Sequence, residues 1–558
     1  MFTRQRLIDG GLILVLALIA GAGLVYEYLL SHYAGRVLGL MEHAIFAMIG
    51  VMIVSMGVGA FLARFIKDPH LGFALLEVLI AVLGATSILA MAGAFALAEW
   101  MPAVLSETYR IPQDLIPRGG LHDGVARLAE WVPFALGFVL GALVGMEIPL
   151  IARAREALYG GPLAHNAGTV YGADYVGAGL GAALFVLVFL SIAPERGAVY
   201  AALINLAAGS AFLVLRWQQL RWRALLVGLH GAALLLCAVL YLQAGRWHEN
   251  LEDMLYADQV VFAAQTPFQR IVLTRNARST PIDYRLYLNG RLQFSSIDER
   301  LYHEMLVHPA MAASARHDHV LLVGGGDGLA LREILKWEPK KVTVLELDEG
   351  MVDLFAQANG PNAPLLDLNA RAFSDSRVSV RLGDAFNSVQ ALANAATRFD
   401  VIIVDLPDPS HPDLNKLYSL RFYAGLREVL AGDGVMNVQS TSPYHARDAF
   451  LTVGVTLQAA GFGLVQPLHV NVPSFGEWGF WLAAPQGQPL IKRWQDMQMP
   501  KVTHLSPAFL RAATVFPLDF LAGFETMEPN RLGNGLMVQL HGRSWLRGET
   551  RLHGESDQ

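Results

Sequence analysis

The sequence of 558 residues contains a single cysteine, Cys237. One cysteine excludes an internal disulfide and a metal cluster held by several thiolates. Because Cys237 lies within an apolar run, we expect it to be an inert packing residue. Charged residues are also scarce, at 16% of the chain against roughly 25% in soluble proteins. The formal net charge of -6 does not indicate a nucleic-acid partner.

The scarcity of charge is concentrated in the first 245 residues, where apolar runs reach the length needed to cross a bilayer. Glycine and alanine are dense in several runs, and small residues allow helices to approach closely in lipid. We therefore predict an α-helical transmembrane bundle of about seven spans, with the lipid bilayer as its surroundings. The predicted spans are Gly10–Leu30, Ala44–Ile66, Leu71–Leu97, Val132–Ile151, Val170–Ile192, Gly197–Leu215 and Ala224–Leu242.

The distribution of arginine and lysine between the spans leaves the orientation of the bundle open. Clusters at residues 4–6, 64–67, 153–155 and 216–223 favour an N-terminus in the cytoplasm. Seven spans would then place the remaining chain outside, whereas the substrates inferred below are cytosolic. We predict a multi-pass protein of the cell (inner or plasma) membrane with a cytoplasmic catalytic domain, and this conflict stays unresolved at the level of sequence.

Four acidic residues lie within the predicted spans: Glu27, Glu77, Glu147 and Asp174. An ionisable group in lipid is costly and is a functional candidate. Glu27 is near a span end, where it can reach the interface. The others indicate either a path for cations or structural hydrogen bonds between helices.

The composition changes after residue 245 and predicts a domain boundary there. Residues 246–300 are predicted to form a linker and a small β domain, because Asn289-Gly290 separates two alternating segments, as in a two-residue hairpin. A helix is expected to follow and to run to Ala313. Residues 301–490 form the next predicted domain and residues 491–558 a C-terminal extension.

The pattern after residue 318 is typical of a nucleotide-binding α/β domain. An apolar run over 319–323 ends in the glycine-rich turn 324–328, a helical pattern follows, and a second apolar run reaches Glu346. Strand, glycine turn, helix and strand make half of a doubly wound, Rossmann-like sheet of the methyltransferase type. Glu346 is placed to accept hydrogen bonds from both ribose hydroxyls.

Other acids suggest that the ligand is cationic. Asp327 lies in the glycine turn, where it would repel a pyrophosphate and attract a sulfonium-bearing nucleoside. Asp384 follows the predicted strand 378–382 and is placed to accept a hydrogen bond from an adenine amino group. The alternative is that each acid caps a helix or is solvated in a loop.

The fourth predicted strand, 399–404, runs into a proline-rich loop that carries Asp405 and Asp408. Ligands bind outside the carboxyl ends of strands in this architecture, so both acids should face the same crevice as Asp327. Such a site suits a substrate with ammonium groups, of which one must lose a proton before it can attack. One carboxylate would accept that proton and the other would hold the far end of the amine, although a solvated Asp-Pro turn is also common.

The C-terminal half resembles the spermidine synthase (polyamine aminopropyltransferase) family, and the whole chain resembles its membrane-bound, multi-pass subset. The resemblance covers roughly residues 265–481 and rests on the stretches FQRIVL, YLNGRLQFSSIDERLYHEMLVHPA, VLLVGGGDGLALREIL, VLELDEGMV, RLGDAF, DVIIVDLPDP and VMNVQSTSPY. It implies transfer of an aminopropyl group from decarboxylated S-adenosylmethionine to a diamine such as putrescine, giving spermidine and 5'-methylthioadenosine. Decarboxylated S-adenosylmethionine is then a co-substrate, and neither a cofactor nor a metal is implied. The oligomeric state, including a homo-oligomer, is left open.

The resemblance also implies residue roles. Asp405 would be the general base and Asp408 the ammonium anchor. The residues implied to contact the nucleoside are Gln269, Asp327, Glu346, Asp384, Ala385 and Pro412. Those implied for the amine side are Tyr302, His303 and Gln293, together with Asp408.

The sequence departs from the family pattern near the amine. Leu406 and Pro407 stand where a small polar pair is common, and Phe475 stands where the later proline loop usually carries a tyrosine. We therefore expect an amine-side hydroxyl to be missing, with Glu477 as a candidate compensating acid or an exposed residue.

Three hypotheses follow: a membrane-tethered aminopropyltransferase, an S-adenosylmethionine-dependent methyltransferase, and a polyamine transporter or sensor whose synthase-like domain only binds. The paired acids and Asp327 favour the first, because a methyltransferase donor keeps a carboxylate that Asp327 would repel.

Overall fold

The computed structural model describes residues 2–38, 41–109, 121–256, 258–357, 362–409, 411–494 and 499–552. These residues divide into two compact units. The helical unit comprises residues 1–260 with the hairpin turn 289–291, and the sheet unit comprises residues 261–288 and 292–558.

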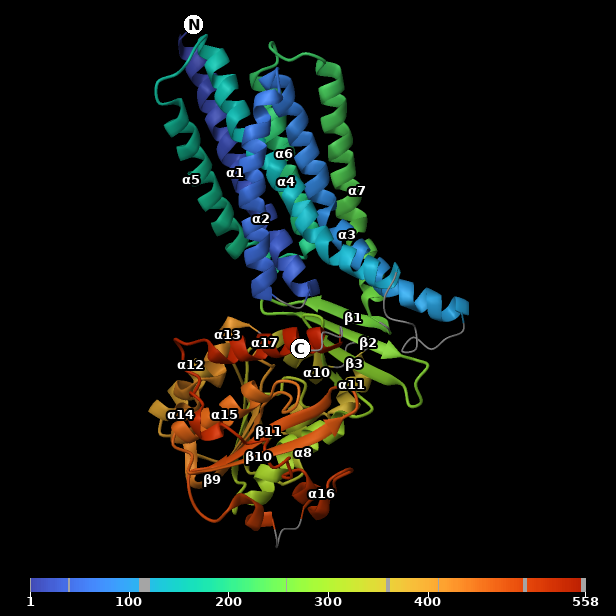
Figure 1. Ribbon diagram of the computed structural model, residues 1–558, viewed down its shortest axis with the longest axis vertical. Helices are drawn as coiled ribbons and strands as arrows, with labels where there is room; N and C mark the ends of the chain where they lie inside the picture. Colours follow the sequence, from blue (N-terminus) through green and yellow to red (C-terminus); the bar gives the residue numbers. More distant parts are fainter. Residues whose placement is uncertain are drawn as a thin grey trace, which may run out of the picture. The chain divides into compact units, whose positions relative to one another are not determined.

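Seven long helices make up the helical unit (Figure 1), and each of the seven predicted apolar runs coincides with one of them. By length and composition, all seven are able to cross a membrane. Short 3-10 turns, η1 (Ala63–Phe65) and η3 (Phe189–Ser191), follow the second and fifth helices. The helices are α1 (Phe2–Leu38), α2 (Met41–Leu62), α3 (Pro69–Tyr109), α4 (Leu121–Tyr159), α5 (Asn166–Leu187), α6 (Pro194–Leu215) and α7 (Arg223–Leu255).

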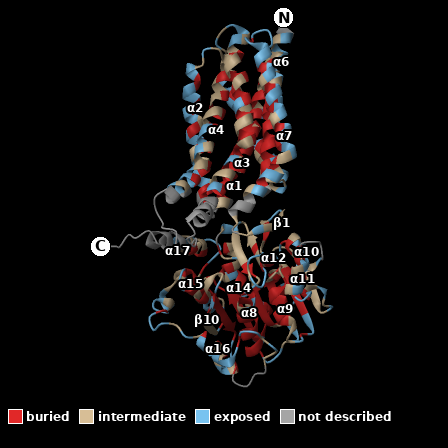
Figure 2. Ribbon diagram, turned by 90° about the vertical axis from the view of Figure 1, so that its right-hand side faces the viewer, coloured by how far each residue is buried: buried red, intermediate tan, exposed pale blue. Residues whose placement is uncertain are grey.

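The helices differ in how deeply they are buried within their own unit. The apolar segment of α3 is 61% buried and that of α6 is 56% buried, whereas those of α2 and α5 are each 22% buried. Figure 2 shows buried residues gathered on the inward sides of the bundle, with exposed residues outside. The exposed residues are largely apolar, as Phe61 on α2, Leu187 on α5 and Leu242 on α7 illustrate. An apolar outer surface around a packed centre is the arrangement that a helix bundle has in lipid.

Small residues allow two helix pairs to approach closely. A Cβ on Gly177 of α5 would overlap the backbone of Ala17 on α1, and a Cβ on Gly145 of α4 would overlap the backbone of Met56 on α2. These positions therefore require glycine, as predicted from the density of small residues in the spans.

A four-stranded sheet follows the bundle in the chain, with the strand order β1-β2-β3-β4. Its strands are β1 (Gln259–Gln265), β2 (Arg270–Asn276), β3 (Asp283–Leu288) and β4 (Arg291–Ser295). Asn289 and Gly290 both have positive φ, at 50° and 79°, which is the conformation of a type I′ turn. The predicted hairpin at Asn289-Gly290 is thus confirmed.

The large sheet has seven strands in the order β10-β11-β9-β8-β5-β6-β7. Strands β5 to β9 are parallel, and β11 pairs antiparallel with both β9 and β10. The chain leaves β5 towards β6 on one side and later returns to β8 on the other side, which makes a switch point between β5 and β8. The strands are β5 (His319–Gly324), β6 (Lys341–Glu346), β7 (Val378–Leu382), β8 (Phe399–Asp405), β9 (Leu430–Gln439), β10 (Leu464–Val472) and β11 (Gly476–Ala484).

Both faces of the large sheet are covered, because alternate side chains of a strand point to opposite faces. Val320 and Leu322 of β5 pack into one apolar core, and Leu321 and Val323 pack into the other. The helices in the described part of the sheet unit are α8 (Glu299–Ala313), α9 (Leu329–Leu335), α10 (Glu349–Ala356), α11 (Ala363–Leu368), α12 (Ala385–Asn394), α13 (Pro412–Asn415), α14 (Leu420–Val429), α15 (Arg447–Ala459), α16 (Pro507–Ala512) and α17 (Leu536–Leu552).

The C-terminal segment packs on the sheet unit. Leu505 and Leu510 share one core with the sheet, and Phe520 and Met537 share the other. The carboxylate of Glu304 on α8 accepts the backbone N–H groups of residues 503, 504 and 505 at 2.6–3.2 Å. Residues 505–537 therefore contribute to both apolar cores, which their sequence did not reveal.

The packing of α5 on α1 gives a test of the bundle. Gly177→Ala should lower the free energy of unfolding by about 1–3 kcal/mol, because the added methyl group forces the two backbones apart. The measurement is the temperature at which the detergent-solubilised protein loses its monodisperse elution. Gly179→Ala is the matched control, since a Cβ at this position on the same helix meets nothing within 4 Å. Equal stability of the two variants would contradict the packing.

Candidate active site

The glycine turn after β5 brings the chain against the end of β8. Gly324 pairs with Asp405 in the register of the two strands. Its φ is +79°, and a Cβ here would overlap the backbone carbonyl of Asp405. Gly328, with φ +74°, starts α9. The turn therefore needs glycine twice, and it places Asp327 beside Asp405 at the switch point, where ligands bind in doubly wound sheets.

Three titratable side chains converge at this switch point. His303 from α8, Asp327 from the turn and Asp405 from β8 each offer an atom within 4.8 Å of the other two. The Tyr302 hydroxyl donates a hydrogen bond of 2.8 Å to Asp405 Oδ1, and His303 Nε2 lies 4.0 Å from Asp327 Oδ2. Asp327 and Asp405, which were predicted to face one crevice, lie close together, and Tyr302 and His303 lie beside them.

A second layer of charge holds His303 in place. Its Nδ1 atom lies 2.8 Å from the carbonyl oxygen and 2.9 Å from the carboxylate of Glu299, one helical turn earlier. Arg332 of α9 donates to both oxygens of the same carboxylate, at 2.8 and 3.0 Å. Nδ1 must therefore carry a proton, which leaves Nε2 to face Asp327. Glu299 and Arg332 were not among the predicted site residues.

The burial of these groups changes their pKa values. Burial alone lowers the pKa of His303, but the hydrogen bond to Glu299 and the charge of Asp327 outweigh it and raise the pKa to about 9. Burial raises the pKa of Asp405 to about 6, against the opposing charge of His303. Burial also raises the pKa of Asp327. At neutral pH the site therefore holds a cationic imidazole beside a largely ionised Asp405, which is the form able to accept a proton.

Glu346 closes β6 beside the glycine turn. Its Oε1 accepts the backbone N–H groups of Leu347 and Asp348 at 2.8 and 3.1 Å. A Cβ on Gly326 would lie 2.8 Å from its Oε2, so only glycine leaves this oxygen accessible from the turn. Burial raises the pKa of Glu346 to about 7. The second oxygen is available for a hydroxyl donor, as the predicted ribose contact requires.

Gln269 is hydrogen-bonded to Asp348, which follows β6 of the large sheet and was not among the predicted site residues. Its Nε2 donates to Asp348 Oδ2 at 2.8 Å, and the hydroxyl of Thr266 donates to the same oxygen at 2.8 Å. Asp348 also caps α10 through Gly350 N at 3.1 Å. Asp348 could have been predicted from the sequence, because it is an acid only two residues after Glu346.

Asp384 lies after β7 and makes two contacts of its own. Its Oδ1 caps α12 by accepting from Asn387 N at 3.1 Å, and its Oδ2 is paired with Lys416. Ala385 and Pro412 are the first residues of α12 and α13. The adenine contact of Asp384 stays a prediction, and Lys416 is a neighbour that no sequence pattern indicated.

Asp408 is held by donors from three parts of the chain. Gln439 Nε2 lies 3.3 Å from Oδ1, while the Thr441 hydroxyl, at 3.2 Å, and His541 Nε2, at 3.3 Å, approach Oδ2. Gln439 and Tyr418 also bond to the backbone carbonyls of the intervening Leu406 and Pro407. Contacts from β9 and from α17 thus hold the acidic loop in place. None of these contacts was predicted from the sequence.

The proline loop that departs from the family pattern supplies rings beside Tyr302. The centroids of Phe475 and Trp478 lie 6.3 and 6.4 Å from that of Tyr302. Glu477 is paired with His469 of β10 instead. Gln293 lies half-buried on β4, and its amine-side role stays a prediction.

The cluster of His303, Asp327 and Asp405 offers ligand atoms that are also able to hold a metal ion. Two carboxylates in a half-buried cluster attract a small cation, a sulfonium or an ammonium included. The expectation that no metal or cofactor takes part stays a prediction.

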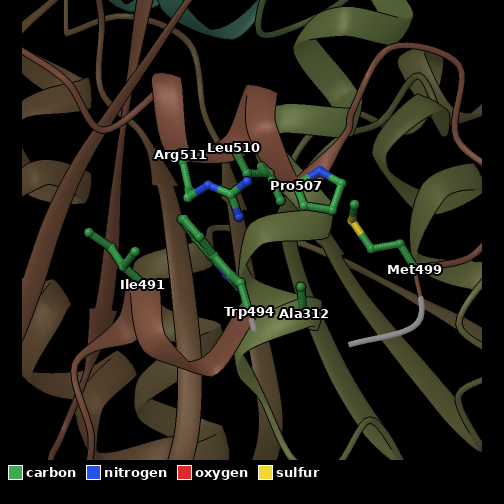
Figure 3. Close-up of a pocket in the computed structure, with 7 residues that line it drawn as sticks. All are labelled: Ala312, Ile491, Trp494, Met499, Pro507, Leu510 and Arg511. Carbon is green, nitrogen blue, oxygen red and sulfur yellow. The ribbon is translucent and has the colours of Figure 1, made fainter. Parts of the chain in front are cut away.

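A small cavity of about 60 Å³ lies elsewhere in the sheet unit (Figure 3). Its lining includes Ala312 of α8 together with Trp494, Leu510 and Arg511 of the C-terminal segment. Figure 3 shows no carboxylate among the labelled side chains. This cavity therefore lacks the acids that proton transfer requires.

Comparison with known proteins gives one family match within the sheet unit and relatives that match nearly the whole chain. Residues 299–494 match the family described as spermine/spermidine synthase domain. A polyamine aminopropyltransferase of Shewanella oneidensis is 46% identical over 541 residues, which cover 95% of this chain and 94% of that protein. Polyamine aminopropyltransferase 1 of Streptomyces coelicolor is 36% identical over 517 residues, covering 91% and 90% respectively.

Among solved structures, a crystal structure of spermidine synthase in complex with the transition-state analogue AdoDATO matches with a TM-score of 0.42 and 23% identity. The match covers 48% of this chain and 89% of that one. The identity to curated relatives extends over nearly the full length of both chains, the helical unit included. This chain belongs to the polyamine aminopropyltransferase family.

Proposed function

We propose that this protein transfers the aminopropyl group of decarboxylated S-adenosylmethionine to a diamine such as putrescine, giving spermidine and 5'-methylthioadenosine. The observation that carries the proposal is the buried carboxylate of Asp405, which Tyr302 orients beside His303 and Asp327 at the switch point. The names of the full-length relatives support the same activity.

The chemical step needs little beyond position and proton removal. The lone pair of a neutral amine nitrogen attacks the methylene carbon next to the sulfonium. The carbon–sulfur bond breaks, its electron pair goes to sulfur, and a neutral thioether leaves. Asp405, the ionised base, accepts one proton from the attacking nitrogen, and the secondary ammonium product stays protonated. Because alkylammonium groups have a pKa of about 10, an acceptor held by Asp408 at its far end must lose a proton at its near end before or during attack.

The donor half of the site is assigned to the acids around the glycine turn. Among the described residues, Glu346 makes its hydrogen bonds through Oε1, which leaves Oε2 to accept from ribose hydroxyls, and Asp327 is assigned to the sulfonium side. Gln269, Asp384, Ala385 and Pro412 complete the proposed nucleoside side. A methyltransferase donor would bring its own carboxylate towards Asp327 and Asp405, and like charges in a buried site are destabilising.

The helical unit is proposed to be a multi-pass membrane domain. Seven helices of sufficient length and apolar character, with apolar side chains on their outer surface, support this assignment. Since both substrates are cytosolic metabolites, we place the catalytic domain on the cytoplasmic side of the cell membrane. Seven crossings then put the N-terminus on the opposite side, against the positive-inside rule.

Replacement of the proposed base gives the most direct test. Asp405→Asn should lower kcat by about two orders of magnitude or more, because the amide cannot accept the proton. The measurement is release of methylthioadenosine by the purified full-length protein from decarboxylated S-adenosylmethionine and a panel of diamines. Asp413→Asn, a change at a side chain that is 87% exposed, serves as the control. Near-normal turnover of Asp405→Asn would refute its role as base.

The fall of kcat/KM at low pH, the acid limb of the pH profile, should reflect the protonation of Asp405. Because its pKa is about 6, kcat/KM should fall as the pH drops through about 6 and the base becomes protonated. The cation at His303 lowers the pKa of Asp405, so His303→Gln should move this limb to higher pH. His504→Gln, an exposed histidine, should leave the limb in place. An unshifted limb in His303→Gln would contradict the electrostatic coupling.

His541 should affect the binding of the diamine rather than the binding of decarboxylated S-adenosylmethionine. His541→Ala removes one of the groups that hold the carboxylate of Asp408, so the KM for the diamine should rise about fivefold, the worth of one hydrogen bond. The KM for decarboxylated S-adenosylmethionine should stay unchanged. Gln539→Ala, on the exposed face of the same helix, is the control. A parallel rise in both KM values would indicate a general loss of structure instead.

A further inference from the structure

Five polar side chains meet inside the helical unit, away from any group used above. The bundle cluster consists of Tyr26 on α1, Glu77 on α3, Glu147 on α4, Asn205 on α6 and His230 on α7. None is more than 4% exposed. Five helices thus each contribute one buried polar residue to this cluster.

The members of the bundle cluster converge through direct contacts and small neighbours. Asn205 Nδ2 donates to Glu77 Oε2 at 3.0 Å, and the carboxyl groups of Glu77 and Glu147 lie within hydrogen-bonding reach of each other. A Cβ on Gly209 would lie 2.8 Å from His230 Nε2 and 2.9 Å from Glu77 Cβ. The glycine therefore makes the space into which the imidazole and the acid both reach.

Tyr26 of α1 lies against the face of α3 that carries Glu77. A Cβ on Gly84, two helical turns after Glu77, would lie 2.6 Å from the Tyr26 hydroxyl oxygen. That hydroxyl interacts electrostatically with both Glu77 and Glu147. The phenol is thus directed toward the same interior as the two acids.

The bundle cluster has hydrogen-bond acceptors without donors. Five buried atoms make no hydrogen bond: Tyr26 OH, Glu77 Oε1, Glu147 Oε1, Asn205 Oδ1 and His230 Nε2. His230 Nδ1 lies 2.9 Å from the carbonyl of Leu226 and so carries the proton, which makes Nε2 of the neutral ring an acceptor. Only the Tyr26 hydroxyl is able to donate. Unpaired buried acceptors are costly, and buried carboxylates without a counter-charge are more so.

The missing partner must be cationic and rich in donors. Within the described part of the bundle, no lysine or arginine acts on Glu77 or Glu147. A metal ion needs several ligand atoms close together. Among all described residues, the one group of three or more His, Cys, Asp or Glu side chains that satisfies this is His303, Asp327 and Asp405. An ammonium group, by contrast, supplies three N–H donors and a positive charge to spread-out acceptors.

We propose that the bundle cluster binds the ammonium group of an aliphatic amine, in exchange for the proton that Glu77 and Glu147 share when the site is empty. Two carboxyl groups within hydrogen-bonding reach require one proton between them. When the ammonium enters and that proton leaves, the net charge of the site is unchanged. The choice of a polyamine as the ligand rests on the proposed function, because such amines are the substrate and product of the sheet unit.

Amine binding and proton release are measured together. The purified full-length protein is titrated with putrescine or spermidine in weakly buffered solution, with a pH-indicating dye for protons and equilibrium dialysis of the radiolabelled amine for binding. Wild type should release a proton with binding at the bundle cluster. Glu77→Gln and Glu147→Gln should each lose that proton release and weaken this binding by tenfold or more, the effect of one charge-assisted hydrogen bond. Glu27→Gln, a buried acid of α1 outside the cluster, should behave as wild type.

Milder variants and other cations complete the test. Tyr26→Phe removes one hydroxyl and no charge, so it should weaken amine binding several-fold and keep the proton release. Choline, which carries no N–H donor, should release no proton. Proton release by sodium ions equal to that by spermidine would overturn the proposal in favour of a metal-cation site. Unchanged binding and proton release in Glu77→Gln and Glu147→Gln would show that the cluster is only structural.

Methylthioadenosine release by the same preparations separates this inference from the proposed function. Glu77→Gln and Glu147→Gln should retain it, since neither residue belongs to the sheet unit. A wild type that releases protons on adding amine but never forms methylthioadenosine would refute the proposed function and leave the bundle site standing. Turnover with decarboxylated S-adenosylmethionine present, but no proton release on adding amine in its absence, would refute the bundle site alone.

Discussion

The proposed site depends on an ionised carboxylate at Asp405, in a place where burial disfavours charge. Burial raises the pKa of Asp405, and the cation at His303 limits that rise. His303 in turn stays protonated because Glu299, itself held by Arg332, lies against its Nδ1. The strand end, the glycine turn and α8 are thus joined by one chain of alternating charges. A general base is most effective when its pKa lies near the working pH, and the pKa of Asp405, at about 6, is near neutral pH.

Most of the sheet unit was predictable because its signals are local. The glycine turn, the acids at the strand ends and the Asn289-Gly290 hairpin are each read from a few neighbouring residues, and backbone sterics leave few other structures for them. The position of Asp327 beside Asp405 also follows, since parallel strands end at the same edge of a sheet.

The residues that were missed come from contacts between distant parts of the chain. Lys416 pairs with Asp384 across 32 positions, and His541 reaches Asp408 across 133. No periodicity or spacing marks such partners, because only the packing of helices on the sheet brings them together. Likewise, the acids of the bundle were visible as exceptions in apolar runs, but their convergence with Tyr26, Asn205 and His230 depends on how the helices rotate about their axes.

The contact of His541 with Asp408 has a consequence for the order in which the loop can be held. His541 lies 133 positions after Asp408, on the helix that begins at Leu536, so it is synthesised after all strands of the large sheet. A nascent chain can therefore have these strands paired while the loop of Asp408 still lacks this contact. Truncation before Leu536 would leave the strands in place and remove one of the groups that hold Asp408.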